Sequence, residues 1–559
     1  MTSVLIDRLR ADLTAANFSV TALTGLWGVE ADAALARNQR VPAERALATL
    51  ARTRRRTEPT ATLATLFVLG RSVSHAELGD ALPDLGVAGA EQLGLVAAAD
   101  ADADFADSAA SAGPAALLRP LVELRPYSFL DDFGADSWWI ISDLGELALG
   151  HALGEDHVLG IGGASRTLSG LILPTPAGRV LDLGTGCGIQ ALHASRHAEH
   201  VVATDISERA LQLAALNAAL NGIDTIEFRL GSLFDPVAGE RFDHIISNPP
   251  FVITPRTPGV PSYEYRDGGM VGDALVEAVV RGAAAHLTPG GVAQLLGNWE
   301  YRGPAAGAGA AAAGTDAFTR LESWLEPAEP ADRLDAWIIE REVQSPAEYA
   351  ETWIRDGGTR PGADFDRLYD AWLDDFGARS VTRVGFGYLL LRSPAAPAPD
   401  ADPDADPDAD VDADAAALPR PHLRRLERLP DAPGHNPTGL GSHLAACLAA
   451  HDWQTGTPDS VLLRAHLTVA SDVTDERHFW PGQDDPALMT LHQGGGFGRQ
   501  VSLDTALAAL VGACDGDLSV AAIVGALAQL LDADERALTT QLLPQVRALL
   551  DDGFLLPPA

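Results

Sequence analysis

Two short segments of this chain carry residue types and spacings that could do chemistry. The first, Val180–Gly188, reads VLDLGTGCG and places three glycines directly after an apolar stretch. Glycine adopts positive φ angles and has no side chain, so such a turn lets a bound molecule approach the backbone closely. The second, Ser247–Phe251, reads SNPPF and follows about sixty residues later. Its asparagine and proline carbonyl present acceptor oxygens, which suits a planar group that bears N–H donors.

The glycine turn is expected to hold a nucleoside-bearing cofactor. The residues of the turn assigned to that role are Asp182, Gly184, Thr185, Gly186 and Gly188. The glycine pattern alone is weak, because dinucleotide sites share it. Asp205 strengthens it: this carboxylate ends the next apolar stretch, 21 residues after Gly184, where it can accept hydrogen bonds from ribose hydroxyls. Ile206 belongs to the same set, and Ser232 and Leu233 are placed to touch an adenine ring.

The proline-rich segment is expected to hold the acceptor. Asn248, Pro249, Pro250 and Phe251 follow a predicted strand, and ligands of open α/β sheets bind beyond the carboxyl ends of strands. The Asn248 amide oxygen and the Pro249 carbonyl can each accept one N–H of an NH2 group, which makes the nitrogen of that group more nucleophilic. Phe251 can stack on a flat acceptor. Asn248 therefore also borders the cofactor. The alternative is a plain proline-rich turn with an Asn cap.

Other reactive residue types are interpreted as structural. Cys187 is expected to be a small filler of the turn, because no partner base is evident. His193 and His197 lie four residues apart, but no nearby carboxylate completes a metal-ligand pattern, so both are expected to face solvent and no metal is predicted. Gly494–Gly498, GGGFG, is expected to be a hairpin turn rather than a phosphate cradle, since no helix start follows it directly.

The elements that must position these residues alternate between strand and helix from 145 to 392. The expected strands are 179–183, 200–204, 226–230, 244–247, 291–296, 335–343 and 381–392, and the first helices are 189–197 and 208–221. This pattern predicts a seven-stranded, parallel, Rossmann-like α/β sheet with helices on both faces. An Ala/Gly-rich insertion at 302–335 interrupts it. Both motifs then lie at one edge of the sheet.

Further segments precede and follow that α/β domain. Residues 1–97 carry apolar residues at helical spacing and are expected to form a helical, winged-helix-like module, with helices over 4–23, 31–50 and 60–69. Residues 98–144 combine a linker with a β-hairpin that turns at Asp131–Gly134.

The C-terminal part is expected to be a separate domain. Residues 393–418 read as an acidic Pro/Asp/Ala linker, and residues 419–559 as an α+β, winged-helix-like domain. Its helices are expected at 443–450, 503–514, 520–531 and 534–551, and its strands at 488–491 and 500–503.

Composition narrows the class of protein. A length of 559 residues allows two to four domains. Three widely spaced cysteines argue against a disulfide framework, and the charged N-terminus argues against a secretory signal. No run reaches the ~18 apolar residues of a membrane span, so a cytoplasmic protein without a membrane partner is expected. The net charge of −37 repels nucleic acid at long range, whereas the basic cluster Arg52–Arg56 is either a solvated helix end or a phosphate contact for RNA.

Residues 179–251 resemble the catalytic core of class I S-adenosylmethionine-dependent methyltransferases of the HemK/PrmC-like, small-domain group. The segments DLGTGCGIQAL, DISERALQLAALNAALNG and SNPPF match the order and spacing of that group. The resemblance implies S-adenosylmethionine as cofactor and a macromolecular acceptor, either a glutamine side chain of a translation release factor or an exocyclic amine of an RNA base. Release-factor enzymes usually carry Tyr where this chain has Phe251, and Phe also occurs in guanine-modifying ribosomal enzymes.

The leading interpretation is an N-methyltransferase that acts on a planar amide or amine nitrogen, with a protein glutamine side chain as acceptor. The alternative acceptor is adenine N6 or guanine N2 of rRNA or tRNA. Acidic charge favours protein, and the arginine cluster and winged-helix-like modules favour RNA. A second alternative is a non-catalytic regulatory protein that binds the cofactor, against which Asp205 and Asn248 argue. An NAD-dependent oxidoreductase is disfavoured, because it gives SNPPF no role. The sequence leaves the oligomeric state open.

Overall fold

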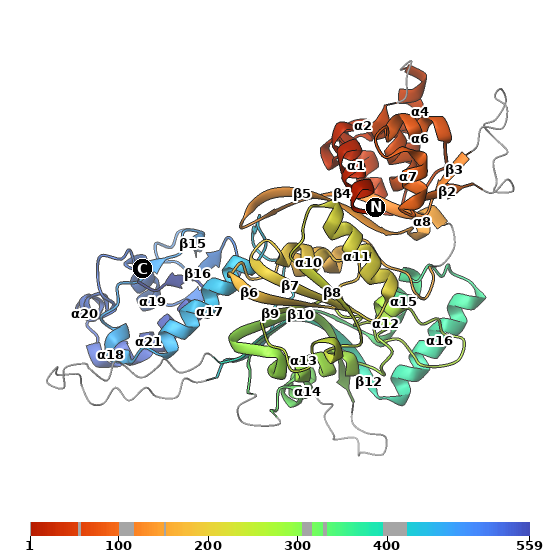
Figure 1. Ribbon diagram of the computed structural model, residues 1–559. Helices are drawn as coiled ribbons and strands as arrows, with labels where there is room; N and C mark the ends of the chain where they lie inside the picture. Colours follow the sequence, from red (N-terminus) through yellow and green to blue (C-terminus); the bar gives the residue numbers. More distant parts are fainter. Residues whose placement is uncertain are drawn as a thin grey trace, which may run out of the picture. The chain divides into compact units, whose positions relative to one another are not determined.

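The computed structural model of the chain describes residues 2–53, 58–99, 117–149, 153–303, 316–327, 333–394 and 422–558. It divides into two compact units (Figure 1). The first comprises Met1–Ser169, Ala177–Leu334 and Glu342–Pro394, and the second comprises Gly170–Pro176, Asp335–Arg341 and Ala395–Ala559. No helix of the described residues is long and apolar enough to cross a membrane.

A mixed β-sheet forms the centre of the first unit. Its strands are β6 (Ala177–Leu183), β7 (Ala198–Asp205), β8 (Ile226–Leu230), β9 (Phe242–Ser247), β10 (Leu287–Arg302) and β12 (Val381–Arg392), in the order β12-β10-β9-β6-β7-β8. The seventh expected strand, β11 (Asp335–Gln344), also forms, and most of it belongs to the second unit. Strands β10, β9, β6, β7 and β8 run parallel.

Strand β12 departs from the expected parallel sheet. It pairs antiparallel with β10, from Val292↔Arg392 to Arg302↔Val381. The prediction of a wholly parallel sheet is therefore wrong at this strand. Two helices, α15 (Pro346–Asp356) and α16 (Ala363–Ala378), precede β12. Strand–helix alternation cannot show in which direction a strand re-enters a sheet after such a pair.

Helices cover both faces of this sheet, as expected (Figure 1). Helices α10 (Ile189–Ala194) and α11 (Glu208–Leu220) lie on one face, and α13 (Ala274–His286) and α14 (Ala317–Trp324) lie on the other. Helix α11 begins where Ser207, as N-cap, accepts a hydrogen bond from the Ala210 amide. Helix α14 lies within the expected insertion, of which 304–315 and 328–332 fall outside the described residues. Shorter helices of this unit are α8 (Glu146–Leu149), α9 (Gly163–Ser169), η2 (Asp235–Val237) and α12 (Glu264–Asp267).

The N-terminal module is mainly helical. Its helices are α1 (Thr2–Ala15), α2 (Val20–Trp27), α3 (Val29–Leu35), α4 (Val41–Thr53), α5 (Pro59–Leu63), the π-helical turn η1 (Ala64–Val68), α6 (His75–Ala81) and α7 (Gly86–Gln92). Two expected long helices are each broken in two, at Asn17 and Asn38, whose φ angles are +50° and +57°. Apolar spacing continues across both breaks, which is why periodicity alone missed them. Arg52 lies in α4, and residues 54–57 of the arginine cluster fall outside the described residues.

Three short strands complete the N-terminal module. They are β1 (Val73–Ser74), β2 (Val96–Ala98) and β3 (Leu117–Pro120), and they form an antiparallel sheet in the order β1-β3-β2. The winged-helix interpretation of this module stays a prediction. Of the expected linker and hairpin at 98–144, residues 100–116 lie outside the described residues.

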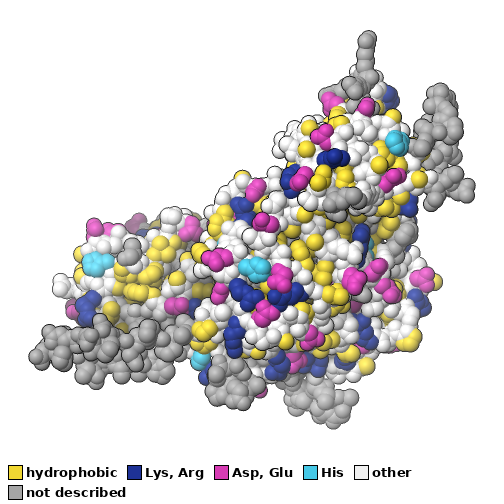
Figure 2. All heavy atoms as spheres, viewed as in Figure 1, with side chains coloured by type: hydrophobic (Ala, Val, Ile, Leu, Met, Phe, Trp, Pro, Cys, Tyr) yellow, Lys and Arg dark blue, Asp and Glu magenta, His cyan; other side chains and the backbone are white. Residues whose placement is uncertain are grey.

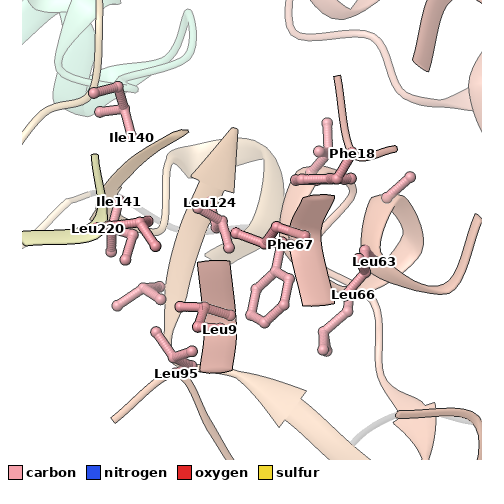
Figure 3. Close-up of a cluster of buried hydrophobic side chains, with 14 of the residues drawn as sticks. Leu9, Phe18, Leu63, Leu66, Phe67, Leu95, Leu124, Ile140, Ile141 and Leu220 are labelled. Atoms are coloured by element: carbon pink, nitrogen blue, oxygen red, sulfur yellow. The ribbon is translucent and has the colours of Figure 1, made fainter. Parts of the chain in front are cut away.

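A β-hairpin joins the N-terminal module to the sheet domain. Strands β4 (Val122–Asp131) and β5 (Gly134–Asp143) pair from Val122↔Asp143 to Asp131↔Gly134, which confirms the predicted turn. One buried apolar cluster runs from the module through this hairpin to α11 (Figure 3). It includes Leu9, Phe18, Leu63, Leu66, Phe67, Leu95, Leu124, Ile140, Ile141 and Leu220. The module and the sheet domain therefore share a core.

The second unit contains the four helices expected for the C-terminal domain. They are α17 (Gly441–Thr455), α19 (Thr505–Gly512), α20 (Val520–Leu530) and α21 (Glu535–Asp551), and a short α18 (Asp459–Leu462) adds to them. Strand β13 (Arg424–Arg428) pairs in parallel with β11, and β14 (Thr468–Val469) pairs with β18 (Leu555–Leu556). Residues 395–421, which include almost all of the acidic linker, lie outside the described residues.

The GGGFG segment joins two antiparallel strands of this unit. Strands β15 (Val473–His478), β16 (Leu488–Gln493) and β17 (Gln500–Leu503) form a small sheet in that order. Between β16 and β17, Gly496 and Gly498 have φ angles of +53° and +64°. The predicted hairpin turn is confirmed. The winged-helix interpretation of the domain stays a prediction.

Candidate active site

A cavity of about 440 Å³ opens at the carboxyl ends of the parallel strands in the first unit. Four consecutive strand-end loops line it: Gly184–Cys187 after β6, Asp205–Ser207 after β7, Gly231–Leu233 after β8 and Asn248–Val252 after β9. This is the edge at which open α/β sheets bind ligands. The structure thus brings the glycine turn and the SNPPF segment, far apart in sequence, to one cavity of a size that suits a nucleoside cofactor.

Positive φ angles and hydrogen bonds to Asp205 fix the conformation of the glycine turn. Gly184, Gly186 and Gly188 have φ angles of +77°, +55° and +89°. Asp205 Oδ2 accepts the Gly186 N–H at 2.9 Å, and Asp205 Oδ1 accepts the Ser207 N–H at 2.9 Å. Burial raises the pKa of Asp205, while these backbone N–H groups favour its ionised form. The carboxylate therefore orders the turn and also borders the cavity.

Two predicted cofactor residues do not border the cavity. Asp182 is fully buried beneath the turn, where its Oδ2 accepts hydrogen bonds from Thr185 Oγ1 at 2.5 Å and the Ala191 amide at 2.9 Å. A Cβ placed at Gly188 would lie 3.0 Å from Ala214 Cβ, so this glycine lets the turn pack against α11. Both residues support the turn on the side that faces away from the cavity. The other assigned residues line the cavity: Gly184, Thr185, Gly186, Asp205, Ile206, Ser232, Leu233 and Asn248.

The SNPPF segment is tied down on both sides. Ser247 Oγ donates to the Leu183 carbonyl at 2.8 Å, which joins the end of β9 to the end of β6. After Phe251, the Val252 N–H donates to the Arg266 carbonyl at 2.9 Å. The Phe251 ring packs against Phe386 of β12, with ring centroids 5.5 Å apart. The loop is therefore held in place without any help from the Asn248 side chain.

The Asn248 amide oxygen is the unusual atom of this loop. It is buried and accepts no hydrogen bond from any residue that the structure describes. Buried acceptors are normally paired, because desolvation without a partner costs about 1–3 kcal/mol. Asn248, Pro249, Pro250 and Phe251 all line the cavity. A bound N–H donor would satisfy this oxygen.

Several cavity residues escaped the sequence reasoning. They are Asp156, His157, Gly160 and Gly162–Ser165 from the segment before β6, Tyr265 and Arg266 of α12, and Trp353 and Asp356 of α15. The glycines of Gly160–Gly163 are a signal that could have flagged the first group. No motif marks Trp353 and Asp356, because they lie on a helix about a hundred residues after SNPPF.

The histidines of α10 and its C-terminal turn differ from expectation. His193 is buried, and its Nε2 lies 3.2 Å from the Tyr127 hydroxyl of β4, so the prediction that it faces solvent is wrong. Burial lowers the pKa of His193 to about 3. His197 is half-buried, with its ring stacked on Phe133. The β4–β5 hairpin covers this helix, which periodicity could not reveal. The described residues contain no group of three or more His, Cys, Asp or Glu that could hold a metal ion.

Cys187 behaves as a filler of the turn. It is buried, and burial raises the pKa of its thiol to about 11. A thiol that stays protonated at neutral pH is a poor nucleophile.

Residues 161–306 match the family model described as "Methyltransferase small domain". The chain contains a class I methyltransferase domain of the small-domain group. Residues 15–107 and 445–557 match two models that are each described as a domain of unknown function, DUF7059 and DUF7782. The methyltransferase match spans β6 to β10 and both motifs, and it ends before α15.

Curated relatives confirm the resemblance to the HemK/PrmC-like group. The release factor glutamine methyltransferase of Xylella fastidiosa is 40% identical over 132 residues, which cover 22% of this chain and 47% of the relative. The ribosomal protein uL3 glutamine methyltransferase of Bradyrhizobium diazoefficiens is 40% identical over 21% of this chain and 40% of the relative. The ribosomal RNA small subunit methyltransferase C of Salmonella newport is 29% identical over 222 residues, 38% of this chain and 58% of the relative. The chain thus covers about half the length of these relatives.

Proposed function

We propose that the protein is an S-adenosylmethionine-dependent N-methyltransferase whose acceptor is the side-chain amide of a protein glutamine. The observation that carries this proposal is the buried, unpartnered Asn248 amide oxygen, which lines the same cavity as Asp205 and the glycine turn. An NH2 group is the simplest partner for that oxygen. The two glutamine-modifying relatives match at 40% identity across this core.

The cavity residues fit S-adenosylmethionine. Asp205 would hold the ribose hydroxyls, Ser232 and Leu233 would border the adenine, and the backbone of Gly184–Gly186 would face the rest of the molecule. When bound, the cofactor supplies an electrophilic methyl group on a sulfonium. The positive φ angles of the turn leave open space beside Gly184 and Gly186, where a Cβ would meet nothing within 4 Å.

The acceptor loop would orient the nitrogen. Asn248 Oδ1 and the Pro249 carbonyl would each accept one N–H, which draws the lone pair of the nitrogen out of amide conjugation. Phe251 would support the plane of the amide. Since the loop is already fixed by Ser247 and Val252, little reorganisation is needed on binding. The nitrogen would lose its proton after methylation, so no base is required before attack.

Surface charge supports a protein acceptor. The net charge of the chain is −37. On the face shown in Figure 2, acidic and basic side chains are interspersed and no wide basic area gathers. Nucleic-acid affinity depends chiefly on phosphate contacts with Lys and Arg, so this surface favours a polypeptide partner.

A second candidate acceptor is the exocyclic amine of an RNA base. One observation favours it: the match to the rRNA methyltransferase extends over 222 residues, against 132 for the release factor enzyme. The chemistry of the Asn248 loop would be the same, because a base amine is also a planar NH2 group.

Methyl transfer to a cell extract separates the two acceptors. The purified protein is incubated with methyl-labelled cofactor and an extract from cells that lack the gene, and the product is then split by protease and by nuclease. Release of the label by protease supports glutamine. Release of the label by nuclease alone would show that the acceptor is an RNA base and not a glutamine.

A further inference from the structure

We propose that helix α15 forms the outer wall of the acceptor site, and that Trp353 and Asp356 on this helix position the acceptor. This inference rests on the proposed function and adds to it the residues that select the substrate. Helix α15 lies outside residues 161–306, the segment that matches the methyltransferase model. Acceptor selection would then come from an element that the shared core does not contain.

Helix α15 is firmly placed. Ser345 and Glu348 form a reciprocal capping box at its start. Its buried residues Tyr349, Ala350 and Ile354 pack in one apolar cluster with Trp372 and Phe376 of α16. Figure 1 shows α15 and α16 side by side, and they connect β11 to β12. A helix fixed at its cap and along its packed face can serve as a rigid wall.

One face of α15 lies along the acceptor loop. Tyr349, Trp353 and Asp356 are spaced four and three residues apart, which places them on one face of the helix. The Tyr349 hydroxyl accepts the Ile253 N–H at 3.0 Å, so this face starts directly beneath the segment that follows SNPPF. The two other residues of this face, Trp353 and Asp356, line the cavity itself.

Trp353 and Phe251 form an aromatic corner. Their ring centroids lie 6.5 Å apart with an angle of 76° between the ring planes. A flat group lying on one of these rings meets the edge of the other, so its rotation in the plane is restricted. The Trp353 backbone is fixed as well, because its carbonyl accepts a hydrogen bond from Arg266 Nη1 at 3.0 Å.

Asp356 keeps hydrogen-bonding capacity toward the cavity. Its carboxylate forms a long ion pair with Arg266, with 3.8 Å between Asp356 Oδ2 and Arg266 Nη1, which is beyond hydrogen-bonding distance. The Arg266 guanidinium donates its hydrogen bonds to Asp267 Oδ1, at 2.9 Å, and to the Trp353 carbonyl. The Asp356 side chain is 51% exposed, whereas that of Arg266 is 6% exposed. Asp356 is thus suited to accept a main-chain N–H next to the target glutamine.

The test compares four variants of the full-length protein in the extract assay, at saturating labelled cofactor and graded amounts of extract. W353A and D356A should each raise the amount of extract that gives half-maximal rate about tenfold, the cost of one lost charged hydrogen bond or aromatic contact. W353F should restore most of the loss. E351Q is the matched control, because Glu351 lies on the same helix, pairs with Arg355 and does not line the cavity.

Calorimetry with S-adenosylhomocysteine completes the test. W353A and D356A should bind it within about twofold of the unmodified protein, because their effect is confined to the acceptor. Weakened binding in both would overturn the positioning role and make α15 a purely structural element. Label transfer with unchanged half-maximal amounts would overturn this inference alone. If the unmodified protein transfers no label, the proposed function fails and takes this inference with it. Label found only in RNA would overturn the main-chain N–H as the partner of Asp356.

Discussion

The two halves of the cavity are built on different principles. The half proposed for the cofactor consists of loops that follow consecutive parallel strands, and its key groups lie within 50 residues, from Gly184 to Leu233. The half proposed for the acceptor takes Asn248 and Phe251 from such a loop, but Tyr265 and Trp353, which also line it, come from elements later in the chain. The segment that matches the family model thus supplies both the glycine turn and the Asn248 loop, whereas α15, the proposed selector of the substrate, lies outside it.

Asn248→Ala should separate the halves most clearly. Loss of the orphan amide oxygen should reduce methyl transfer about a thousandfold or more, because the acceptor nitrogen would lose its orientation and activation. The affinity for S-adenosylhomocysteine, measured by calorimetry, should change less than about threefold. A variant as active as the unmodified protein would remove the proposed acceptor mechanism.

Asp205→Ala should have the opposite effect: it should weaken cofactor binding and leave the use of the acceptor unchanged. Loss of this carboxylate removes the acceptors of the Gly186 and Ser207 amides and the expected partner of the ribose. The Kd for S-adenosylhomocysteine should rise about a hundredfold, which corresponds to roughly 2.7 kcal/mol. The amount of extract at half-maximal rate should stay the same at saturating cofactor. A large change in that amount would show that the two halves are coupled.

Gly188→Ala should act through stability. The added Cβ would lie 3.0 Å from Ala214 Cβ and 3.1 Å from Ala214 Cα, at a residue with a φ of +89°. Strain at this position should lower the free energy of unfolding by about 1–3 kcal/mol, measured by denaturant titration. Gly186→Ala is the matched control for the positive φ, because a Cβ at Gly186 meets nothing within 4 Å. Equal losses in both variants would show that close packing on α11 is unimportant.

Asp182→Asn should produce the smallest change, visible only as a pH dependence. Burial raises the pKa of the Asp182 carboxyl to about 7, so the folded protein binds a proton that the unfolded chain has released above about pH 4. The stabilising contribution of the protonated form is complete below pH 4 and is lost as pH rises through 7. The melting temperature of the unmodified protein, relative to Asp182→Asn, should fall by a few degrees over that range. A constant difference would contradict the raised pKa.

The sequence predicted the parts of this site that depend on local patterns. Gly184 and Asn248 each follow an apolar strand, so both motifs could be placed at one edge of the sheet. The rule that ligands bind beyond the carboxyl ends of parallel strands needs no long-range information. His193 could not be placed, since its burial comes from a hairpin sixty residues earlier. Trp353 and Asp356 were missed for the same reason. They lie on a helix that is far from SNPPF in the sequence, and no local motif marks residues that make such long-range contacts. The antiparallel direction of β12, which follows α15 and α16, was likewise not visible in the local pattern.

The shared core of the first unit has a consequence for how this protein unfolds. Asn217 of α11 hydrogen-bonds to the backbone N–H and carbonyl of Ile141, and Asn221, the C-cap of α11, does the same with Trp139. The apolar cluster then continues from Leu220 to Leu9 of α1. Heat should therefore melt the N-terminal module and the sheet domain in one cooperative transition. A chain that begins after β5, at residue 144, should expose the apolar residues of α11 that this cluster buries, and it should therefore aggregate.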